Sequence, residues 1–229
     1  MSTAPFLVVS NFKSHQTQSD LTSWLNRVKV PSSPSISLAI APSFPHLSLL
    51  SDVRYSNSDI RSCAQTVSPF PYGSYTGAVN AHQLQEMGIN YCLVGHSERR
   101  IYFHEDSNDV ARQVHELVSV GITPIICQRA QDISPDRAAL NDGDLVSAIF
   151  CFEPSADIGG TVTAPLEEIK KVTTQISSIF ATPKVMYGGS VNANNITTLL
   201  TLDLAGVLVS TASLNPTDFN SLLSLIPHE

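Results

Sequence analysis

The chain has 229 residues, of which 13 are Lys or Arg and 20 are Asp or Glu, so its formal net charge is −7. A hydrophobic fraction of 42% is ordinary for a globular protein and argues against a disordered chain. The acidic balance argues against binding to nucleic acid or to an anionic membrane surface. No run approaches the roughly 18 apolar residues that a membrane span needs. The net negative charge does not exclude a phosphate ligand, because one Lys and a few backbone N–H groups can make the local electrostatic potential positive.

The cysteines and the N-terminus indicate the compartment. Cys63, Cys92, Cys127 and Cys151 stand far apart, with no C-x-x-C pair and no His at metal-binding spacing. This spacing predicts free, buried thiols in a reducing environment and no metal site. The N-terminus has no basic start, and its first apolar run is too short for a signal peptide. We therefore expect a soluble, cytoplasmic protein.

Short β-rich runs recur along the whole chain. Most are apolar at both alternating positions, which is typical of strands that are covered on both faces of a parallel sheet. Eight such runs occupy residues 6–12, 36–41, 60–65, 91–96, 123–128, 148–153, 184–188 and 205–210.

Segments with helical periodicity separate most of these runs. Apolar residues recur at helical spacing within 20–28, 110–118, 166–176 and 215–226. Strand–helix alternation repeated eight times predicts an α/β fold, a closed (β/α)8 TIM barrel, as a single domain over residues 1–229. An open, doubly wound sheet is the alternative. Residues 129–147 leave room for only a turn or two of helix, so we expect a shortened fifth βα unit.

Two residues at strand ends are candidates for proton transfer, because the catalytic face of a parallel barrel lies at the carboxyl ends of its strands. Glu153 ends the sixth run and is a candidate general base, or else a carboxylate paired with a neighbouring Arg. His96 ends the fourth run and precedes a helical turn, whose positive end disfavours the imidazolium. A neutral imidazole N–H can donate to a substrate carbonyl; the alternative is an ordinary buried histidine.

Charged and polar residues at the first strand suit an anionic ligand. Lys13 lies two residues beyond Asn11, on the same side of an extended chain. It is either a point charge for the ligand or an ordinary surface lysine. Glu98 either holds Lys13 across the mouth of the barrel or caps its own helix.

Small polar residues follow the last two strands, where barrels often bind phosphate through backbone N–H groups. These are the segments 188–190 and 210–213, and each is a weak signal by itself.

The connection 66–79 is long and carries Phe70, Tyr72 and Tyr75. It either docks into a partner or folds over its own barrel.

Taken together, these motifs resemble the triosephosphate isomerase family along nearly the whole chain. The matching segments are NFK at 11–13, CAQ at 63–65, YTG at 75–77, VGHSERR at 94–100, FEP at 152–154, IG at 158–159, YGGS at 187–190 and ASL at 212–214. The heptad at 94–100 is the most specific and argues against another phosphosugar enzyme on the same barrel.

The resemblance implies the interconversion of dihydroxyacetone phosphate and glyceraldehyde 3-phosphate through an enediolate, in glycolysis and gluconeogenesis, with no cofactor. It implies that Glu153 is the base, that His96 polarises the carbonyl and shuttles protons between the substrate oxygens, and that Lys13 stabilises negative charge. The implied substrate contacts are Asn11, Glu98 (which would orient Lys13), Gly159, Ser190, Ser210 and Thr211. Thr76 would reach into a neighbouring subunit, which implies at least a homodimer.

This chain also departs from the family pattern. Ser210 and Thr211 stand where two glycines are usual, Ala156 where many members have Trp, and Ala78 where Glu is common. The stretch after Gln128 lacks the usual Gly-Glu, so we expect that the fifth unit has lost its helix. Altered outer packing would follow, with a tetramer as one outcome. A non-catalytic barrel derived from this family, which binds a phosphorylated metabolite or a protein partner, is the alternative function.

Overall fold

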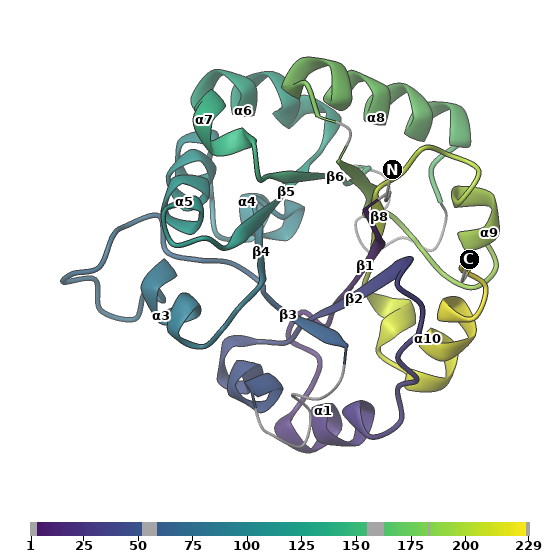
Figure 1. Cartoon of the computed structure of the whole chain (residues 1–229). Coiled ribbons are helices and arrows are strands. Elements are labelled where there is room, and N and C mark those ends of the chain that lie inside the picture. Colours follow the sequence, from purple (N-terminus) through teal and green to yellow (C-terminus); the bar gives the residue numbers. More distant parts are fainter. Residues whose placement is uncertain (1–3, 52–58, 155–162, 183, 228–229) are drawn as a thin grey trace.

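A computed structural model gives the architecture of residues 4–51, 59–154, 163–182 and 184–227. Eight parallel strands close into one barrel in chain order, and β1 pairs with both β2 and β8. Figure 1 shows the strands around a central axis with the helices outside them. The closed barrel is confirmed. The alternative of an open sheet is wrong, because β1 pairs with β8 and the sheet therefore has no free edge.

All eight predicted strands are present, and six of them are shorter than the predicted runs. Their bounds are β1 Phe6–Asn11, β2 Ile36–Ala41, β3 Ile60–Ala64, β4 Tyr91–Val94, β5 Thr123–Gln128, β6 Ile149–Phe152, β7 Val185–Tyr187 and β8 Gly206–Val209. The polar residues that follow the strands therefore lie just beyond the sheet, at the rim of the barrel.

The predicted helices are also present, together with several short ones. The α-helices are α1 Gln18–Leu25, α3 Ala81–Glu86, α4 Ser97–Tyr102, α5 Ser107–Ser119, α6 Ile133–Ala139, α7 Asp142–Leu145, α8 Leu166–Phe180, α9 Ile196–Leu199 and α10 Pro216–Leu223. Short 3-10 segments are η1 Phe44–Ser51, η2 Ala130–Asp132 and η4 Thr211–Ser213. In the part of the chain that the structure describes, no helix is long and apolar enough to cross a membrane.

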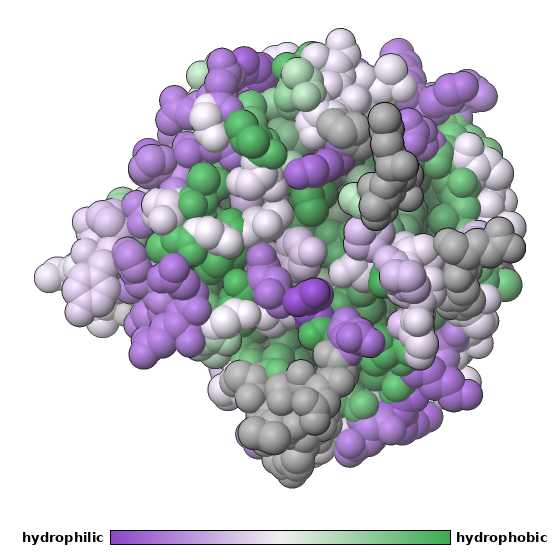
Figure 2. Space-filling model, in the orientation of Figure 1, coloured by the Kyte–Doolittle hydropathy of each residue, from purple (hydrophilic) through white to green (hydrophobic). Residues whose placement is uncertain are grey.

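The core has two layers, because alternate residues of each strand point into the barrel or toward the helices. The inner layer includes Leu7, Val9, Leu93 and Met186, and the outer layer packs the strands against the surrounding helices. In Figure 2, hydrophobic side chains show between the hydrophilic ones at the surface of this ring. All four cysteines are buried and free, as the sequence predicted.

The fifth βα unit keeps helical structure, so the expected loss of its helix is wrong. Asp136 in α6 is fully buried, and its carboxylate accepts hydrogen bonds from Arg100 Nη2 at 2.8 Å, Gln128 Nε2 at 2.8 Å and Ser107 Oγ at 2.7 Å. These partners lie on three other segments, and they stabilise a helix of 7 residues, which agrees with the turn or two of helix for which residues 129–147 leave room. A shortening of this unit relative to the family stays a prediction.

The connection 66–79 projects away from the barrel between β3 and α3 (Figure 1). Its aromatic side chains are exposed, with Tyr72 at 78% of its full area, so the loop does not fold over its own barrel. Phe70 and Tyr75 stack on each other with ring centroids 4.7 Å apart. The loop therefore presents a preformed apolar tip to its surroundings.

Candidate active site

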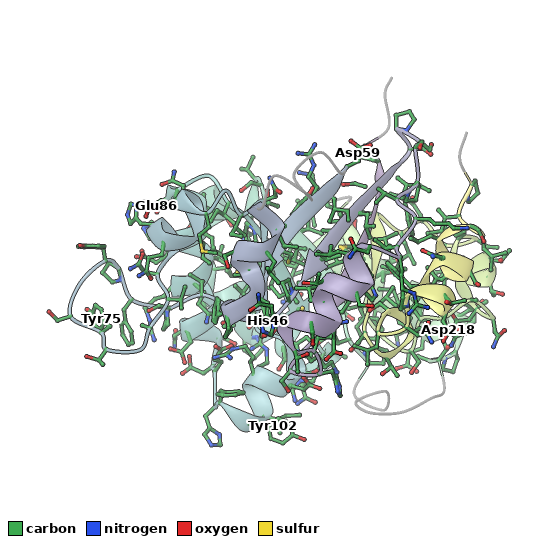
Figure 3. The ribbon with its side chains drawn as sticks, turned by 90° about the horizontal axis from the view of Figure 1, so that it is seen from below. His46, Asp59, Tyr75, Glu86, Tyr102 and Asp218 are labelled. Carbon is green, nitrogen blue, oxygen red and sulfur yellow. The ribbon has the colours of Figure 1, made fainter. Side chains whose placement is uncertain are left out.

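A cavity of about 430 Å³ lies at the carboxyl ends of the strands. Figure 3 shows the two ends of the barrel: Asp59, which precedes β3, is at one end, and Tyr102, in the helix that follows β4, is at the other. Asn11 of β1, Leu208 of β8 and residues of the segments that follow β1, β4, β6, β7 and β8 line the cavity. They are Asn11, Lys13, His96, Ser97, Glu98, Glu153, Pro154, Gly188, Gly189, Ser190, Val191, Asn192, Leu208, Ser210, Thr211, Ala212 and Asp218.

His96 and Glu153 face each other inside this cavity. His96 Nε2 lies 3.1 Å from Glu153 Oε1, and the two residues are 8% and 4% exposed. His96 caps α4, and its Nδ1 accepts a hydrogen bond from the backbone N–H of Glu98 at 3.2 Å. An accepting Nδ1 carries no proton, so the ring is neutral and Nε2 holds its hydrogen. The arrangement places an N–H donor beside a carboxylate.

The Glu153 carboxylate is held by a second contact, which no motif in the sequence indicates. Its Oε2 accepts the backbone N–H of Ser97 at 2.8 Å. This hydrogen bond and the contact with His96 fix the orientation of the carboxylate inside the cavity. Among the residues described, no Arg pairs with Glu153, so the alternative of an Arg ion pair is not observed.

Lys13 is fixed at both its backbone and its side chain. Its Nζ lies 2.7 Å from Glu98 Oε1, and its backbone N–H donates to Asn11 Oδ1 at 3.0 Å. The backbone φ of Lys13 is +49°, which is uncommon for a residue other than glycine. Gln65 Nε2 donates to the Lys13 carbonyl at 2.9 Å and to the Ala41 carbonyl at 2.8 Å. These contacts set the ammonium group at the mouth of the barrel.

Because Gly188 has no side chain, there is room beside it for the side chain of Glu153. A Cβ at this position would lie 2.7 Å from Cys151 Sγ and 3.3 Å from Glu153 Cγ. The backbone after β7 therefore approaches β6 more closely than any other residue would permit. This close approach sets the wall behind the carboxylate.

The opposite part of the cavity is lined by small polar residues after β7 and β8. The Ser190 carbonyl accepts from Thr163 Oγ1 at 2.9 Å and from Asn195 Nδ2 at 2.6 Å, which fixes the turn that follows β7. Ser210 directly precedes the 3-10 turn η4, whose first residue is Thr211. The predicted phosphate contacts Ser190, Ser210 and Thr211 thus line one cavity with Lys13.

The remaining predicted residues are placed as follows. Gly159 lies outside the described residues, as does Ala156. Thr76 is exposed on the projecting connection and does not line the cavity. The cavity also contains Ser97, Asn192 and Asp218, which sequence reasoning missed. Ser97 contributes a backbone N–H, which no side-chain motif reveals.

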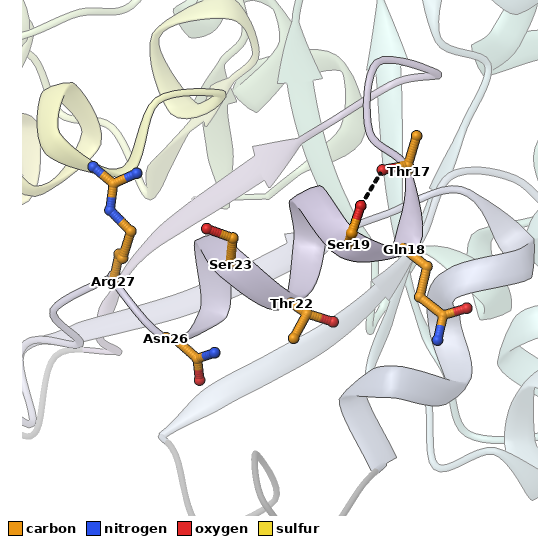
Figure 4. A pocket seen from close by; sticks show the side chains of 7 residues that line it. All are labelled: Thr17, Gln18, Ser19, Thr22, Ser23, Asn26 and Arg27. Atoms are coloured by element: carbon orange, nitrogen blue, oxygen red, sulfur yellow. Dashed lines mark hydrogen bonds between the residues drawn. The ribbon is translucent and has the colours of Figure 1, made fainter.

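A second, more open hollow of about 780 Å³ runs along the exposed side of α1. Its lining is mostly Ser, Thr and amide side chains with Arg27, and Thr17 Oγ1 and Ser19 Oγ lie 3.0 Å apart (Figure 4). No carboxylate or imidazole lines it among the described residues, so it offers no proton-transfer group.

No group of three or more His, Cys, Asp or Glu side chains that could hold a metal ion occurs within the described ranges. The side chains in the cavity at the carboxyl ends of the strands instead suit proton transfer on a small anionic molecule: a carboxylate, a neutral imidazole and one ammonium group.

Comparison with known proteins identifies the family. The family model described as triosephosphate isomerase matches residues 6–226. The chain is 30% identical to the triosephosphate isomerase of Orientia tsutsugamushi (strain Boryong), with 96% of this chain and 97% of the relative covered. It is 32% identical to that of a Synechococcus strain, with 96% of each chain covered, and 31% identical to that of Dictyostelium discoideum, with 98% of each covered. The chain therefore belongs to the triosephosphate isomerase family.

Proposed function

We propose that this protein is an isomerase that interconverts dihydroxyacetone phosphate and glyceraldehyde 3-phosphate through an enediolate. Membership of the triosephosphate isomerase family supports this reaction, as do the names of the relatives. The observation that carries the proposal is the meeting of Lys13, His96 and Glu153 in one cavity, although 140 positions separate the first from the last.

Glu153 is the proposed base. Its carboxylate takes a proton from the carbon next to the substrate carbonyl and returns it to the neighbouring carbon, so no net proton is consumed. The 4% exposure of Glu153 supports this role, because water competes little for a buried carboxylate.

His96 and Lys13 are proposed to stabilise the charge that develops on the substrate oxygens. The Nε2–H of His96 donates to the carbonyl oxygen as it becomes an enediolate oxygen. The same ring then passes the hydroxyl proton from one substrate oxygen to the other, so that the carbonyl and the hydroxyl exchange places and His96 ends in its starting state. The Lys13 ammonium, held by Glu98, lies at the same cavity and attracts the negative charge. Asn11 supports the Lys13 backbone and lines the cavity.

The substrate phosphate is proposed to bind beside Ser190, Ser210 and Thr211. Backbone N–H groups and hydroxyls at these residues supply hydrogen bonds without a cationic side chain. Gly159 completes the predicted set, although it lies outside the described part of the chain.

The test is a coupled isomerisation assay in which a dehydrogenase consumes the product. Glu153→Gln keeps the side-chain size but removes the base, and turnover should fall by about 10² or more. Glu86→Gln is the matched control, since Glu86 ends α3 on the outside of the barrel (Figure 3) and should keep the wild-type rate. A near-native rate for Glu153→Gln would refute the role. A wild-type protein that binds phosphate analogues without isomerising them would favour the non-catalytic alternative.

We further propose that the protein is a cytoplasmic homodimer joined through the connection 66–79. The exposed Phe70 and Tyr75 stack supports an apolar contact, and Thr76 would reach the neighbouring subunit. The four free thiols support a reducing compartment. The mass in solution, measured for wild type and for Tyr72→Ser with Tyr75→Ser, tests the assembly: a monomeric wild type contradicts it, and a tetramer extends it.

A further inference from the structure

The charges around the cavity are unevenly distributed. Lys13 is the single Lys or Arg among its lining residues in the described chain, while Glu98, Glu153 and Asp218 are acidic. Two of these carboxylates are engaged: Glu98 pairs with Lys13, and Glu153 contacts His96 and the Ser97 N–H. Asp218 has neither an ion pair nor a side-chain hydrogen bond to another described residue. Among the described residues it is therefore the one carboxylate of the cavity that no other side chain engages.

Asp218 belongs to the part of the cavity beside Ser210 and Thr211. It lies in the first turn of α10, the helix that follows η4 directly. Figure 3 places it on the C-terminal segment, at the end of the barrel away from Asp59. The next residue, Phe219, is fully buried, and the N-cap Asn215 accepts the Thr217 N–H at 2.8 Å. The helix is thus anchored, so its backbone holds Asp218 at the rim.

We propose that Asp218 is a specificity-determining residue that weakens binding of the substrate phosphate by electrostatic repulsion and so sets KM. The proposal rests on the proposed function, because it assumes that phosphate binds beside Ser210 and Thr211. The hydrogen-bond donors of Ser210 and Thr211 are neutral, so they do not offset the negative charge of Asp218. The one ammonium group of the described lining, that of Lys13, is already paired with Glu98. A repulsion that acts equally on bound substrate and on the transition state raises KM and leaves kcat unchanged.

The test compares Asp218→Asn with the wild type in the isomerisation assay at low ionic strength. Removing the charge should lower KM by about three- to tenfold, the range expected for a monoanion near a dianion in a partly screened site. Turnover should stay within about twofold, and the KM difference should shrink in about 1 M salt, where the Debye length is about 3 Å. Asp218→Glu retains the charge and should keep a KM near that of the wild type.

Asp203→Asn is the control for net charge. Asp203 is also exposed, but it precedes β8 and so lies at the amino end of the barrel. An unchanged KM for Asp218→Asn, or an equal fall for Asp203→Asn, would overturn the proposal. A loss of thermal stability with no change in KM would do the same, since it would assign Asp218 only to the helix dipole of α10.

Binding of inorganic phosphate, measured by calorimetry, separates this proposal from the proposed function. Asp218→Asn should bind phosphate about three- to tenfold more tightly than wild type, whether or not the wild type isomerises triose phosphates. A wild type without isomerase activity refutes the function. Equal phosphate affinities for wild type and Asp218→Asn refute the role of Asp218.

Discussion

Gly188→Ala tests how the wall behind Glu153 is built. The added Cβ would lie 2.7 Å from Cys151 Sγ, closer than real Cβ contacts, and 3.3 Å from Glu153 Cγ. The Cys151 sulfur is buried in the inner layer of the barrel and cannot move into solvent. The clash must therefore displace the strand end, the sulfur or the Glu153 side chain.

The contact distances give the expected size of the effect. Overpacking a buried site by one methyl group costs about 1–3 kcal/mol, which for a chain of this length lowers Tm by roughly 2–10 °C. A shift of about 1 Å in a catalytic group can cost about 10² in rate, so a displacement of a few tenths of an ångström should lower kcat about tenfold. Both thermal unfolding and the coupled isomerisation assay should register the change.

A double mutant locates the cause. Cys151→Ala removes the sulfur that the new Cβ meets, so Gly188→Ala with Cys151→Ala should be more stable than the two separate losses imply, by about 1 kcal/mol. Gly143→Ala is the matched control: a Cβ there meets nothing within 4 Å, so the change should leave the rate unchanged and should not lower stability, since Ala is favoured over Gly within a helix such as α7. Wild-type stability and rate in Gly188→Ala, or no favourable coupling with Cys151→Ala, would refute the reasoning.

Two further predictions concern ionisable groups. Burial alone would raise the pKa of Asp132, but hydrogen bonds from Arg129 at 2.7 and 2.8 Å and the charge of Arg100 hold it below its usual value. Asp132 therefore stabilises the fold above the pKa of an unfolded Asp, about 3.9, and this contribution disappears as the pH falls through the lowered value. Asp132→Asn should lose about 2 kcal/mol of unfolding free energy at pH 7 and approach the wild type near pH 2, and a pH-independent difference would contradict this. Burial also raises the pKa of the Cys63 and Cys92 thiols, and a hydrogen bond with Cys151 together with burial raises the pKa of the Cys127 thiol. A thiol reagent at pH 8 should therefore react with these three cysteines only after unfolding, and rapid labelling of the native protein would contradict that.

Local signals in the sequence were sufficient for the strands and the main helices. Each buried strand is a short apolar run, and α5 and α8 show apolar residues at helical spacing. The same reasoning failed for α6, because its stability depends on Arg100, Gln128 and Ser107, which contact Asp136 from other segments. Gln128 lies 8 residues before Asp136, but Ser107 and Arg100 lie 29 and 36 residues before it, outside any local window of sequence.

The candidate site was partly predictable for a related reason. Asn11, Lys13, His96 and Glu153 follow strands, and the carboxyl ends of parallel strands meet at one face, so their convergence followed from the fold class. Asp218 was missed because it lies in the first turn of a helix, where an acidic residue is expected to favour the helix dipole. Its place at the rim of the cavity follows from how α10 packs after β8.

The sequence by itself determined the barrel, because alternating apolar runs and helical stripes allow few other ways to bury both faces of eight strands. It also indicated the residues at strand ends that reach the mouth, such as Lys13, His96 and Glu153, since strand ends are properties of the local chain. The tertiary structure alone decided the contacts. These are the hydrogen bond from the Ser97 N–H to Glu153, the ion pair between Glu98 and Lys13, and the close packing of Gly188 against Cys151 and Glu153. Each of these depends on the separation in space of segments distant in sequence, a quantity fixed only when the whole barrel closes.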